Sequence, residues 1–482
     1  FRRPIRKVIF LLFLISGVIF FACHPERSYI EDTDASLTFT LDTVYFDTVF
    51  TTIGTVTESF RIKHPHNQFI RIDEITLAGG ESSVFRINVD GKPGIRFTGL
   101  EIAPRDSMYL FVEATLDPNM SNEILRIQDS IVFLTNGNLQ DIDLVAWGQD
   151  VHIIHDSIID VHTTWSAEKP YLILNYAYVD SVSVLTIDPG VRIYLHRDAL
   201  LFVEGTLKVN GTLEEPVLFG GDRLEEFYED IPGQWGLIYL SERSRNNRIE
   251  YAEIRNGTIG ILISASPESG KMPDLEITNS IINTMSSNGI YALNASVTGT
   301  NLVIGDCGGS CAGLIYGGEY DFTHCTFSNH WPSWFSNRQL PALFMADYFG
   351  NYDEEGNLVV YAGGAFTRAR FRNSIITGNA RMELVIDSYD GSQLNYRFDH
   401  CLTKIDEDSL DYLSDPLFSD ILNNRNPLLL DTIPHLFHLD SLSPAIDAGL
   451  PAHAIELPFD MNGNSRLDDA APDLGAYERI EE

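Results

Sequence analysis

The sequence is short of basic side chains. Its 482 residues include 33 lysines and arginines against 68 aspartates and glutamates, so the formal net charge is −35. A field of this sign repels the phosphates of nucleic acid and the headgroups of anionic lipids, and we expect neither as a partner. Hydrophobic residues still make up 44% of the chain, which is enough to bury large cores and excludes global disorder.

Local signatures of common enzymes are also missing. The sequence has no Walker loop, no dinucleotide-binding glycine fingerprint, no His-Glu-x-x-His and no Gly-x-Ser-x-Gly. Cysteines number only 5, and Cys307 and Cys311 are separated by Gly-Gly-Ser. These two can close a small disulfide loop in an oxidising compartment, but two further ligands for zinc are not nearby.

The first residues have the pattern of an export signal. Four of residues 2–7 are Arg or Lys, residues 8–22 carry no charge, and Cys23 follows Ala22. The uncharged run is too short to span a bilayer comfortably and fits the apolar part of a signal peptide. The arrangement resembles the cleavage site of bacterial lipoproteins, which implies that 1–22 is removed and that an acylated Cys23 anchors the protein in the lipid bilayer. An uncleaved anchor with a free Cys23 is the alternative.

Residues 23–35 are expected to form a tether. Its acids Glu31, Asp32 and Asp34 resemble the export signals of Bacteroidetes surface lipoproteins. The resemblance implies an outer-membrane location with the protein facing the cell exterior, and the periplasmic face is the alternative.

Residues 36–150 alternate between apolar and polar side chains. Segments 60–63, 69–72 and 84–89 show this period of two, and turn signals such as Asp90-Gly91 separate such segments. Regular short strands of this kind predict an antiparallel β-sandwich. The pattern resembles immunoglobulin-like domains, and the fold class expected for the whole chain is all-β.

The sequence pattern changes near residue 183. We expect the preceding residues 151–182 to form a connector or N-terminal cap. A Pro-Gly turn at 189–190, a Gly-Thr-Leu turn at 205–207 and a Trp-Gly step at 235–236 follow one another. Their order resembles the opening coils of right-handed parallel β-helix proteins. The resemblance implies a β-helix over 183–440 that carries an insertion at 330–368.

An internal repeat also indicates a solenoid. One column of residues recurs with apolar residues two and four positions before it; its members are Glu253, Asn279, Asn301, His324, Asn373 and His400. The spacings of 26, 22, 23, 49 and 27 residues are near one β-helix coil, and 49 indicates one coil with an excursion. Asn and His tolerate positive φ well, so we expect the Asn and His members to turn a corner between two strands. The next residue then points inward, which predicts that Cys325 and Cys401 are core residues.

The insertion at 330–368 is rich in aromatic side chains. Trp331, Trp334, Phe335 and Tyr348 suit stacking on a carbohydrate or contact with a protein, and they are candidate ligand-binding residues. Alternatively they cover the apolar flank of the solenoid. A second insertion at 222–230 contains five acids and two aromatic residues, and we expect a solvated loop there.

The C-terminal residues 441–482 contain three sequence blocks. These are Ser-Pro-Ala-Ile-Asp-Ala-Gly at 443–449, Asp-Met-Asn-Gly-Asn-Ser-Arg at 460–466 and Asp-Leu-Gly-Ala-Tyr-Glu at 473–478. Together they resemble the C-terminal region of choice-of-anchor Q proteins, which are secreted or lipid-anchored bacterial β-helix proteins. The resemblance implies that the β-helix ends in a cap, and it implies no defined reaction.

The middle block also contains a possible metal site. Asp460, Asn462 and Asn464 alternate oxygen ligands as calcium loops do, so calcium is the possible cofactor. The glycine stands between the second and third ligands, however, and a hydrogen-bonded turn that caps the last coil is the alternative.

Only weak patterns favour an enzymatic role. The Asn-Thr-Asp and Gly-His-Gly blocks that β-helix pectin hydrolases use are absent. Lyases of this fold need a basic residue, and residues 249–404 contain only Lys271 and Lys404 as lysines. Arg370 and Arg397 match in register and can bind a uronic acid, or merely balance the local acids.

The sequence therefore predicts an outer-membrane lipoprotein that has no reaction of its own. We expect it to bind a glycan or to dock on an outer-membrane β-barrel protein complex, because stacked coils present an extended surface. Two alternatives remain open. One is a polysaccharide lyase or glycoside hydrolase on the solenoid face, and the other is an accessory subunit of an outer-membrane transport or assembly machine.

Overall fold

The computed structural model describes most of the chain, and the chain divides into two compact units. The described residues are 27–33, 35–50, 57–116, 125–265, 272, 274–353, 358–389, 394–406, 416–430, 437–468 and 470–480. The units are Phe1–Asp150 and Val151–Glu482. Cys23 and the expected signal peptide lie outside the described residues. Within the described ranges, no helix combines the length and the apolar character needed to cross a bilayer.

The first unit contains two five-stranded sheets. The first sheet has the strand order β1 (Thr38–Phe39), β3 (Glu58–Lys63), β8 (Ser107–Ala114), β5 (Phe85–Val89) and β6 (Lys92–Gly94). The second has the order β2 (Thr43–Phe50), β10 (Asn138–Gln149), β9 (Leu125–Thr135), β4 (Ile70–Leu77) and β7 (Arg96–Ile102). Neighbouring strands are antiparallel, except that β2 and β10 are parallel.

One hydrophobic core serves both sheets of this unit. In β8 the alternate residues Leu110 and Val112 are fully buried, while their neighbours Tyr109 and Phe111 face solvent. Residues of β4, β9 and β10 complete the same core. The predicted period of two is therefore present, but the unit is mixed rather than wholly antiparallel. The likeness to immunoglobulin domains stays a prediction.

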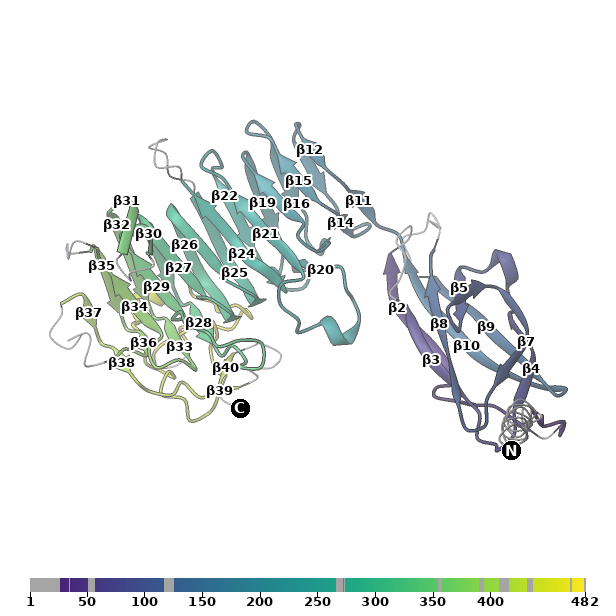
Figure 1. Cartoon of the computed structure of the whole chain (residues 1–482). Coiled ribbons are helices and arrows are strands. Elements are labelled where there is room, and N and C mark those ends of the chain that lie inside the picture. The colour runs from purple at the N-terminus through teal and green to yellow at the C-terminus, as the bar shows by residue number, and fades with distance from the viewer. Residues whose placement is uncertain are drawn as a thin grey trace, which may run out of the picture. The chain divides into compact units, whose positions relative to one another are not determined.

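The second unit is a large parallel β solenoid. One sheet of 26 strands winds through it, and each strand pairs in parallel with the strand one coil further along. Figure 1 shows these strands stacked coil upon coil. Each coil contributes to three faces, and the long strands β25 (Asp274–Met285), β26 (Ile290–Cys307) and β27 (Ala312–Thr323) bend to serve more than one of them.

The remaining strands fall on these faces in regular order. The first face contains β11 (His152–Ile154), β14 (Tyr171–Ile173), β17 (Arg192–Leu195), β20 (Val217–Gly221), β23 (Ala252–Arg255), β28 (Thr326–Asn329), β33 (Ile375–Gly378), β36 (Leu402–Thr403) and β38 (Leu422–Asn423). The second contains β12 (Ser157–Ile159), β15 (Tyr176–Val179), β18 (Leu200–Val203), β21 (Trp235–Leu240), β24 (Gly257–Ser264), β29 (Leu343–Ala346) and β34 (Leu384–Asp387). The third contains β13 (Thr163–Trp165), β16 (Val184–Ile187), β19 (Thr206–Asn210), β22 (Asn247–Glu250), β32 (Phe366–Arg372), β35 (Tyr396–Asp399) and β37 (Phe418–Ser419).

The solenoid begins earlier than the sequence predicted. Residues 151–182, expected to be a connector or cap, contain β11 to β15, which pair in register with β14 to β18. The strands of these first coils are only three or four residues long.

The predicted corner column is present, with one error of register. The Asn and His members all adopt positive φ of 45–52°; they are Asn279, Asn301, His324, Asn373 and His400. In the first coil of the column the corner is Tyr251 at φ 45°, not Glu253. Ile249 pairs with Ile277, which places Tyr251 opposite Asn279. The column continues to Asp420, one coil beyond His400.

The cysteines lie inside the solenoid. Cys325 and Cys401 are fully buried in its core, as predicted, and burial raises the pKa of each thiol to about 12. Cys307 and Cys311 are free thiols in the same core, so the disulfide considered for them does not form. Burial, more than the contact with Cys307, also raises the pKa of Cys311.

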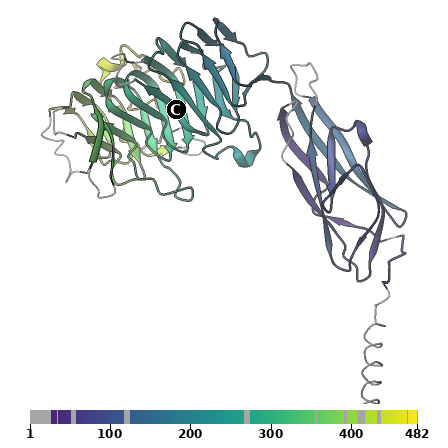
Figure 2. The same cartoon turned by 45° about the horizontal axis from the view of Figure 1, so that its top comes forward.

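The C-terminal segment lies along the first face of the solenoid and not over its end. This corrects the prediction of a cap on the last coil at 441–482. Ala476 donates its N–H to Thr326 Oγ1 on β28, and Gly475 donates to the carbonyl of Asn373. Leu474 packs with Ile375 in one of the small clusters beneath the segment. In Figure 2 the yellow C-terminal stretches run beside the green and teal coils.

The outer surface of the first face explains this location. Its outward residues form a row over five coils that is apolar except for Thr326, which lies between Val303 and Ile375; the apolar members are Ile281, Val303, Ile375 and Leu402. An apolar row on the outside of a solenoid needs a cover, and the C-terminal segment supplies it. Arg466 attaches the segment to the solenoid, because its guanidinium donates both to Glu478 of the segment and to Asn301 Oδ1 of the solenoid.

Candidate functional site

Two insertions leave the solenoid at the same corner, the one between its first and second faces. Segment 222–234, with the short helix η2 (Glu226–Tyr228), connects β20 to β21, and segment 330–342 connects β28 to β29. Every coil passes this corner in the same direction, so insertions far apart in sequence emerge on the same side of the solenoid.

A cavity of about 640 Å³ lies where the two insertions meet, and we call it the aromatic pocket. Its lining residues come from both insertions and from the corners of the coils between and beside them: Asp230, Ile231, Thr284, Asp306, His330, Trp331, Pro332, Ser333, Trp334, Phe335 and Asn379. A concave surface of this size, mostly apolar with a few polar groups, has the character of a small-molecule site.

The aromatic side chains of the pocket have different exposures. Trp331 is buried at 4% exposure, whereas Trp334 is 77% exposed and Phe335 is 37% exposed. The Phe335 ring lies 5.3 Å from that of Trp331 and 6.2 Å from that of Trp334. Trp331 also donates its indole N–H to Ser336 Oγ. Trp331 is therefore the base of the cluster, and Trp334 presents free ring surface to a ligand.

Hydrogen bonds at the solenoid corner hold polar groups of the pocket in place. Asp306 is a corner residue at φ 49°, and its Oδ1 accepts the backbone N–H of His330 at 3.0 Å. His330 in turn contacts Ser328 Oγ through Nδ1 at 3.1 Å. Burial lowers the pKa of His330, so its ring is neutral at pH 7. Asp230 contributes a second carboxylate from the other insertion.

A buried ion pair helps to attach the tryptophan loop of the pocket to the solenoid. Arg338 and Glu383 are 3% and 0% exposed, and Arg338 Nη2 lies 2.6 Å from Glu383 Oε1. Arg338 also donates to Asn379 Oδ1, and Asn379 Nδ2 donates to the carbonyl of Trp331. The loop that contains the tryptophans is thus bonded through Asn379 to the coil of β33.

The acidic insertion is solvated, as predicted, with Glu226, Phe227 and Glu229 exposed, and it is also bonded to the solenoid. Asn256, a corner residue, donates from Nδ2 to the carbonyls of Glu229 and Ile231. Gln234 Nε2 donates to the carbonyl of Ile231 as well. Within the loop, Arg223 pairs with Glu225. These contacts place Asp230 and Ile231 at the edge of the aromatic pocket.

The structure brings together three of the predicted ligand-binding residues and separates the others. Trp331, Trp334 and Phe335 line one pocket. Tyr348 is buried on β30 (Tyr348–Tyr352), which pairs with β31 (Leu358–Gly363), and its hydroxyl donates to Asp387. Tyr348 therefore covers the flank of the solenoid, which was the alternative considered for the whole insertion.

The two predicted arginines lie on the third face, outside the pocket lining. Arg370 pairs in register with Arg397, as predicted. The arginines on either side of Arg370 are bonded to acids of the preceding coil: Arg368 lies 2.6 Å from Glu319, and Arg372 pairs with Asp321. Neutralisation of local acids accounts for this part of the row.

The predicted calcium loop is a hydrogen-bonded turn in the structure. Asp460 Oδ1 accepts the backbone N–H of Asn462 at 2.9 Å and that of Asn464 at 2.7 Å. Asn464 donates its side-chain amide to Asp460 Oδ2, so its nitrogen and not its oxygen faces the carboxylate. The turn lies beside Asn301, which donates to the carbonyl of Phe459, and not at the last coil. Calcium binding there stays a prediction.

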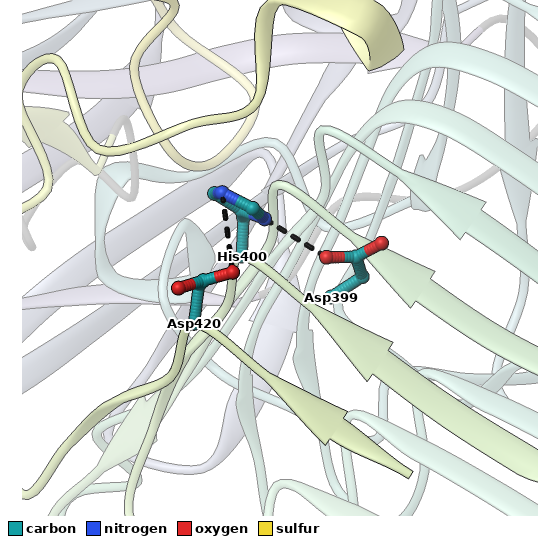
Figure 3. A group of neighbouring side chains, drawn as sticks. All are labelled: Asp399, His400 and Asp420. Carbon is teal, nitrogen blue, oxygen red and sulfur yellow. Dashed lines mark hydrogen bonds and ion pairs between the residues drawn. The ribbon is translucent and has the colours of Figure 1, made fainter. Parts of the chain in front are cut away.

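A second titratable cluster lies near the last coils. Asp399, His400 and Asp420 place ligand atoms within 4.8 Å of one another, and Figure 3 shows the His400 ring between the two carboxylates. His400 Nδ1 is 2.8 Å from Asp399, and Nε2 is 3.8 Å from Asp420. His453 on α2 (Pro451–Ala454) approaches the other oxygen of Asp399 at 3.3 Å.

The side chains of this cluster mainly contact one another. Burial acts to raise the pKa of Asp399, but hydrogen bonds from His400 and His453 outweigh it, so the pKa is lowered. The donor types suit a divalent transition metal. The geometry is nevertheless that of a hydrogen-bonded clamp between the C-terminal segment and the solenoid, and the predicted corner residue His400 has structural surroundings in it.

Sequence reasoning missed the polar half of the aromatic pocket. Asp230, Asp306, His330 and Asn379 were not candidates, although all four line it. One signal was available: both insertions interrupt the coil at the same corner. The two insertions can be assigned to the same corner only when the strand register is known. The repeat in the sequence does not give the correct register for the coils before Asn279.

Comparisons with known proteins identify no family. No protein-family model matches the chain, and no curated protein matches it. A solved structure of a family 123 glycoside hydrolase from Clostridium perfringens is similar over 23% of this chain and 26% of its own, with 9% identity and a TM-score of 0.18. The catalytic unit of a GH87 α-1,3-glucanase from Streptomyces thermodiastaticus is similar over 72% and 79%, with 11% identity and a TM-score of 0.25. Likeness at this level says nothing of function.

Proposed function

We propose that the solenoid unit binds a glycan in the aromatic pocket. The observation that carries this proposal is the exposed ring of Trp334 at a cavity whose polar lining groups include two carboxylates, an amide and an imidazole. The apolar face of a sugar ring packs on an aromatic ring, and its hydroxyls need fixed polar partners nearby. The pocket provides both on a rigid solenoid corner.

Binding to Trp334 is testable with purified protein and a glycan microarray, followed by calorimetry on the glycans retained. Trp334→Ala is expected to weaken binding about tenfold or more. Its unfolding temperature should not change, because the side chain is 77% exposed. Phe227→Ala is the matched control: Phe227 is 76% exposed on the neighbouring insertion and does not line the pocket. Equal binding by both variants would contradict the proposal.

A glycoside hydrolase is the second candidate for the same pocket. Asp230 and Asp306 both line it, and glycoside hydrolysis uses two carboxylates on either side of the scissile bond. Release of reducing ends from a retained glycan, abolished by Asp306→Asn, would favour this candidate. Retention of the intact glycan over long incubation would favour binding alone.

The anchor belongs to the same proposal. We infer from the pattern around Cys23 that the protein is an acylated outer-membrane lipoprotein that faces the cell exterior. Mass spectrometry of the mature N-terminus should show an acylated Cys23, and Cys23→Ser should release the protein from membranes. An unmodified Cys23 in membrane-bound protein would contradict the anchor and leave the pocket proposal intact.

A further inference from the structure

Two histidines follow β3 in the first unit. Phe60 and Ile62 of this strand point into the core, and His64 continues the alternation with 2% exposure. Pro65 comes next, and then His66, which is half-buried. A polar ring at an inward position needs partners for its nitrogens, because a buried nitrogen without one costs free energy.

One nitrogen of His64 has a partner. Its Nε2 lies 2.5 Å from the carbonyl oxygen of Gln68, and since a carbonyl only accepts, Nε2 carries the proton and donates it. Nδ1 of the neutral ring therefore presents a lone pair. Among the residues that the structure describes, neither His64 Nδ1 nor His66 Nε2 has a hydrogen-bond partner, although both atoms are buried.

The separation of the two rings fits a shared metal ion. An imidazole nitrogen binds zinc at about 2.0–2.1 Å, so the centre of its ring lies about 3.2 Å from the ion. Two such rings on one tetrahedral ion have centres about 5.2 Å apart. The ring centres of His64 and His66 are 5.4 Å apart, with their planes at 45°. One ion can therefore bind both without a large movement of either ring.

The turn between β7 and β8 holds both histidines in place. His64 donates its backbone N–H to the carbonyl of Asp106 at 3.0 Å, and the carbonyl of His66 accepts the N–H of Arg105 at 3.0 Å. Arg105 also donates from its side chain to Asn67 Oδ1. The backbone of both residues is thus positioned before an ion arrives, which reduces the ordering that binding requires.

We propose that His64 and His66 bind a transition-metal ion that prefers imidazole nitrogen, zinc or copper. A metal-bound histidine ordinarily donates its other ring N–H to a carboxylate or a carbonyl, and His64 makes that bond to Gln68. Within the described ranges no third His, Cys, Asp or Glu side chain joins the pair. Solvent reaches the half-buried His66, so water completes the coordination. The formal net charge of −35 favours the approach of a cation.

The test uses the untagged full chain, freed of metal with a chelator and titrated with Zn²⁺ or Cu²⁺ in a calorimeter. His66→Ala is expected to weaken the binding of one ion about tenfold or more. The paramagnetic resonance spectrum of the Cu²⁺ complex should show coupling to two imidazole nitrogens in the wild type and to one in this variant. His155→Ala is the matched control, because His155 is an exposed histidine of the other unit, and it should change neither result.

A variant of the Asp399, His400 and Asp420 cluster separates the two places where a metal can bind. His400→Asn should fold, since Asn373 occupies the same corner one coil earlier, and it should keep the ion assigned to the histidine pair. Binding that persists in His66→Ala and disappears in His400→Asn would overturn the proposal, as would a wild type that binds neither ion. Binding of only one of the two ions, lost in His66→Ala, would support the proposal and identify the metal. Thermal unfolding checks that each variant folds.

Discussion

Asn279 turns one corner of the solenoid with its backbone and bonds that corner to the next coil with its side chain. The residue adopts φ 48°, and its Oδ1 accepts a hydrogen bond from Asn301 in the next coil at 2.9 Å. Asn279→Ala loses the bond and places an ordinary side chain in the left-handed region, so the free energy of unfolding should fall by about 1–2 kcal/mol. Asn279→Gly keeps the backbone relaxed and should cost less. Urea unfolding of both variants measures the difference, and equal losses would contradict the strain argument.

The same corner shows what single residues reveal in a sequence. Asn and His were predicted there because their side chains tolerate positive φ, and the structure confirms all five such positions. Tyr251 was missed since tyrosine has no such preference, and the packing of its strand, not its own chemistry, brings it to the corner. Corners can therefore be predicted where local preference and register agree, and not where register alone decides.

His324 makes the solenoid sensitive to acid. Its ring is fully buried, and burial, with the nearby positive charge of Arg466 and the neighbouring His453, depresses its pKa well below the ordinary value. The unfolded chain binds a proton below pH about 6.5 while the folded chain does not, so stability is present above that pH and is lost as pH falls. The slope due to His324 should approach about 1.4 kcal/mol per pH unit.

His324→Asn tests this sensitivity. Asparagine fits the corner, since Asn301 and Asn373 occupy it in the adjacent coils. The variant should fold and lose less stability than wild type between pH 7 and pH 5 in urea titrations. Part of the slope should remain, because burial also lowers the pKa of His453. An unchanged slope would contradict the role assigned to His324.

At the scale of elements, the buried pair of Arg338 and Glu383 attaches the tryptophan loop to the solenoid. Arg338→Met leaves the Glu383 carboxylate buried without its cation, and the expected cost is about 3–5 kcal/mol. The double variant Arg338→Met with Glu383→Met removes both charges and should recover a large part of that loss. Thermal unfolding of the wild type, of both single variants (Arg338→Met and Glu383→Met) and of the double variant measures the coupling. A loss in the double variant equal to the sum of the two single losses would show that the pair contributes no coupling.

The sequence predicted the strands and the repeat more fully than it predicted which distant segments contact one another. The period of two and the 20–50-residue repeat indicated a sandwich-like unit and a solenoid, because both patterns are local. The cover over Ile281, Val303, Ile375 and Leu402 was missed, as was the meeting of the two insertions. These contacts join segments far apart in the chain, and only the strand register brings them together.

At the scale of the whole molecule, the two units have separate cores. The core of Phe1–Asp150 and that of Val151–Glu482 share no residue. Cooperative unfolding follows from a shared core, so we expect two thermal transitions in calorimetry. A chain limited to residues 151–482 should keep one of the two at its original temperature and bind glycan as the full chain does, since all lining residues of the aromatic pocket lie within it. The comparison also separates two origins of the acid sensitivity: the transition that remains in the shortened chain is the one His324→Asn must alter. A single transition in the full chain that shifts downward on truncation would show that the units stabilise one another.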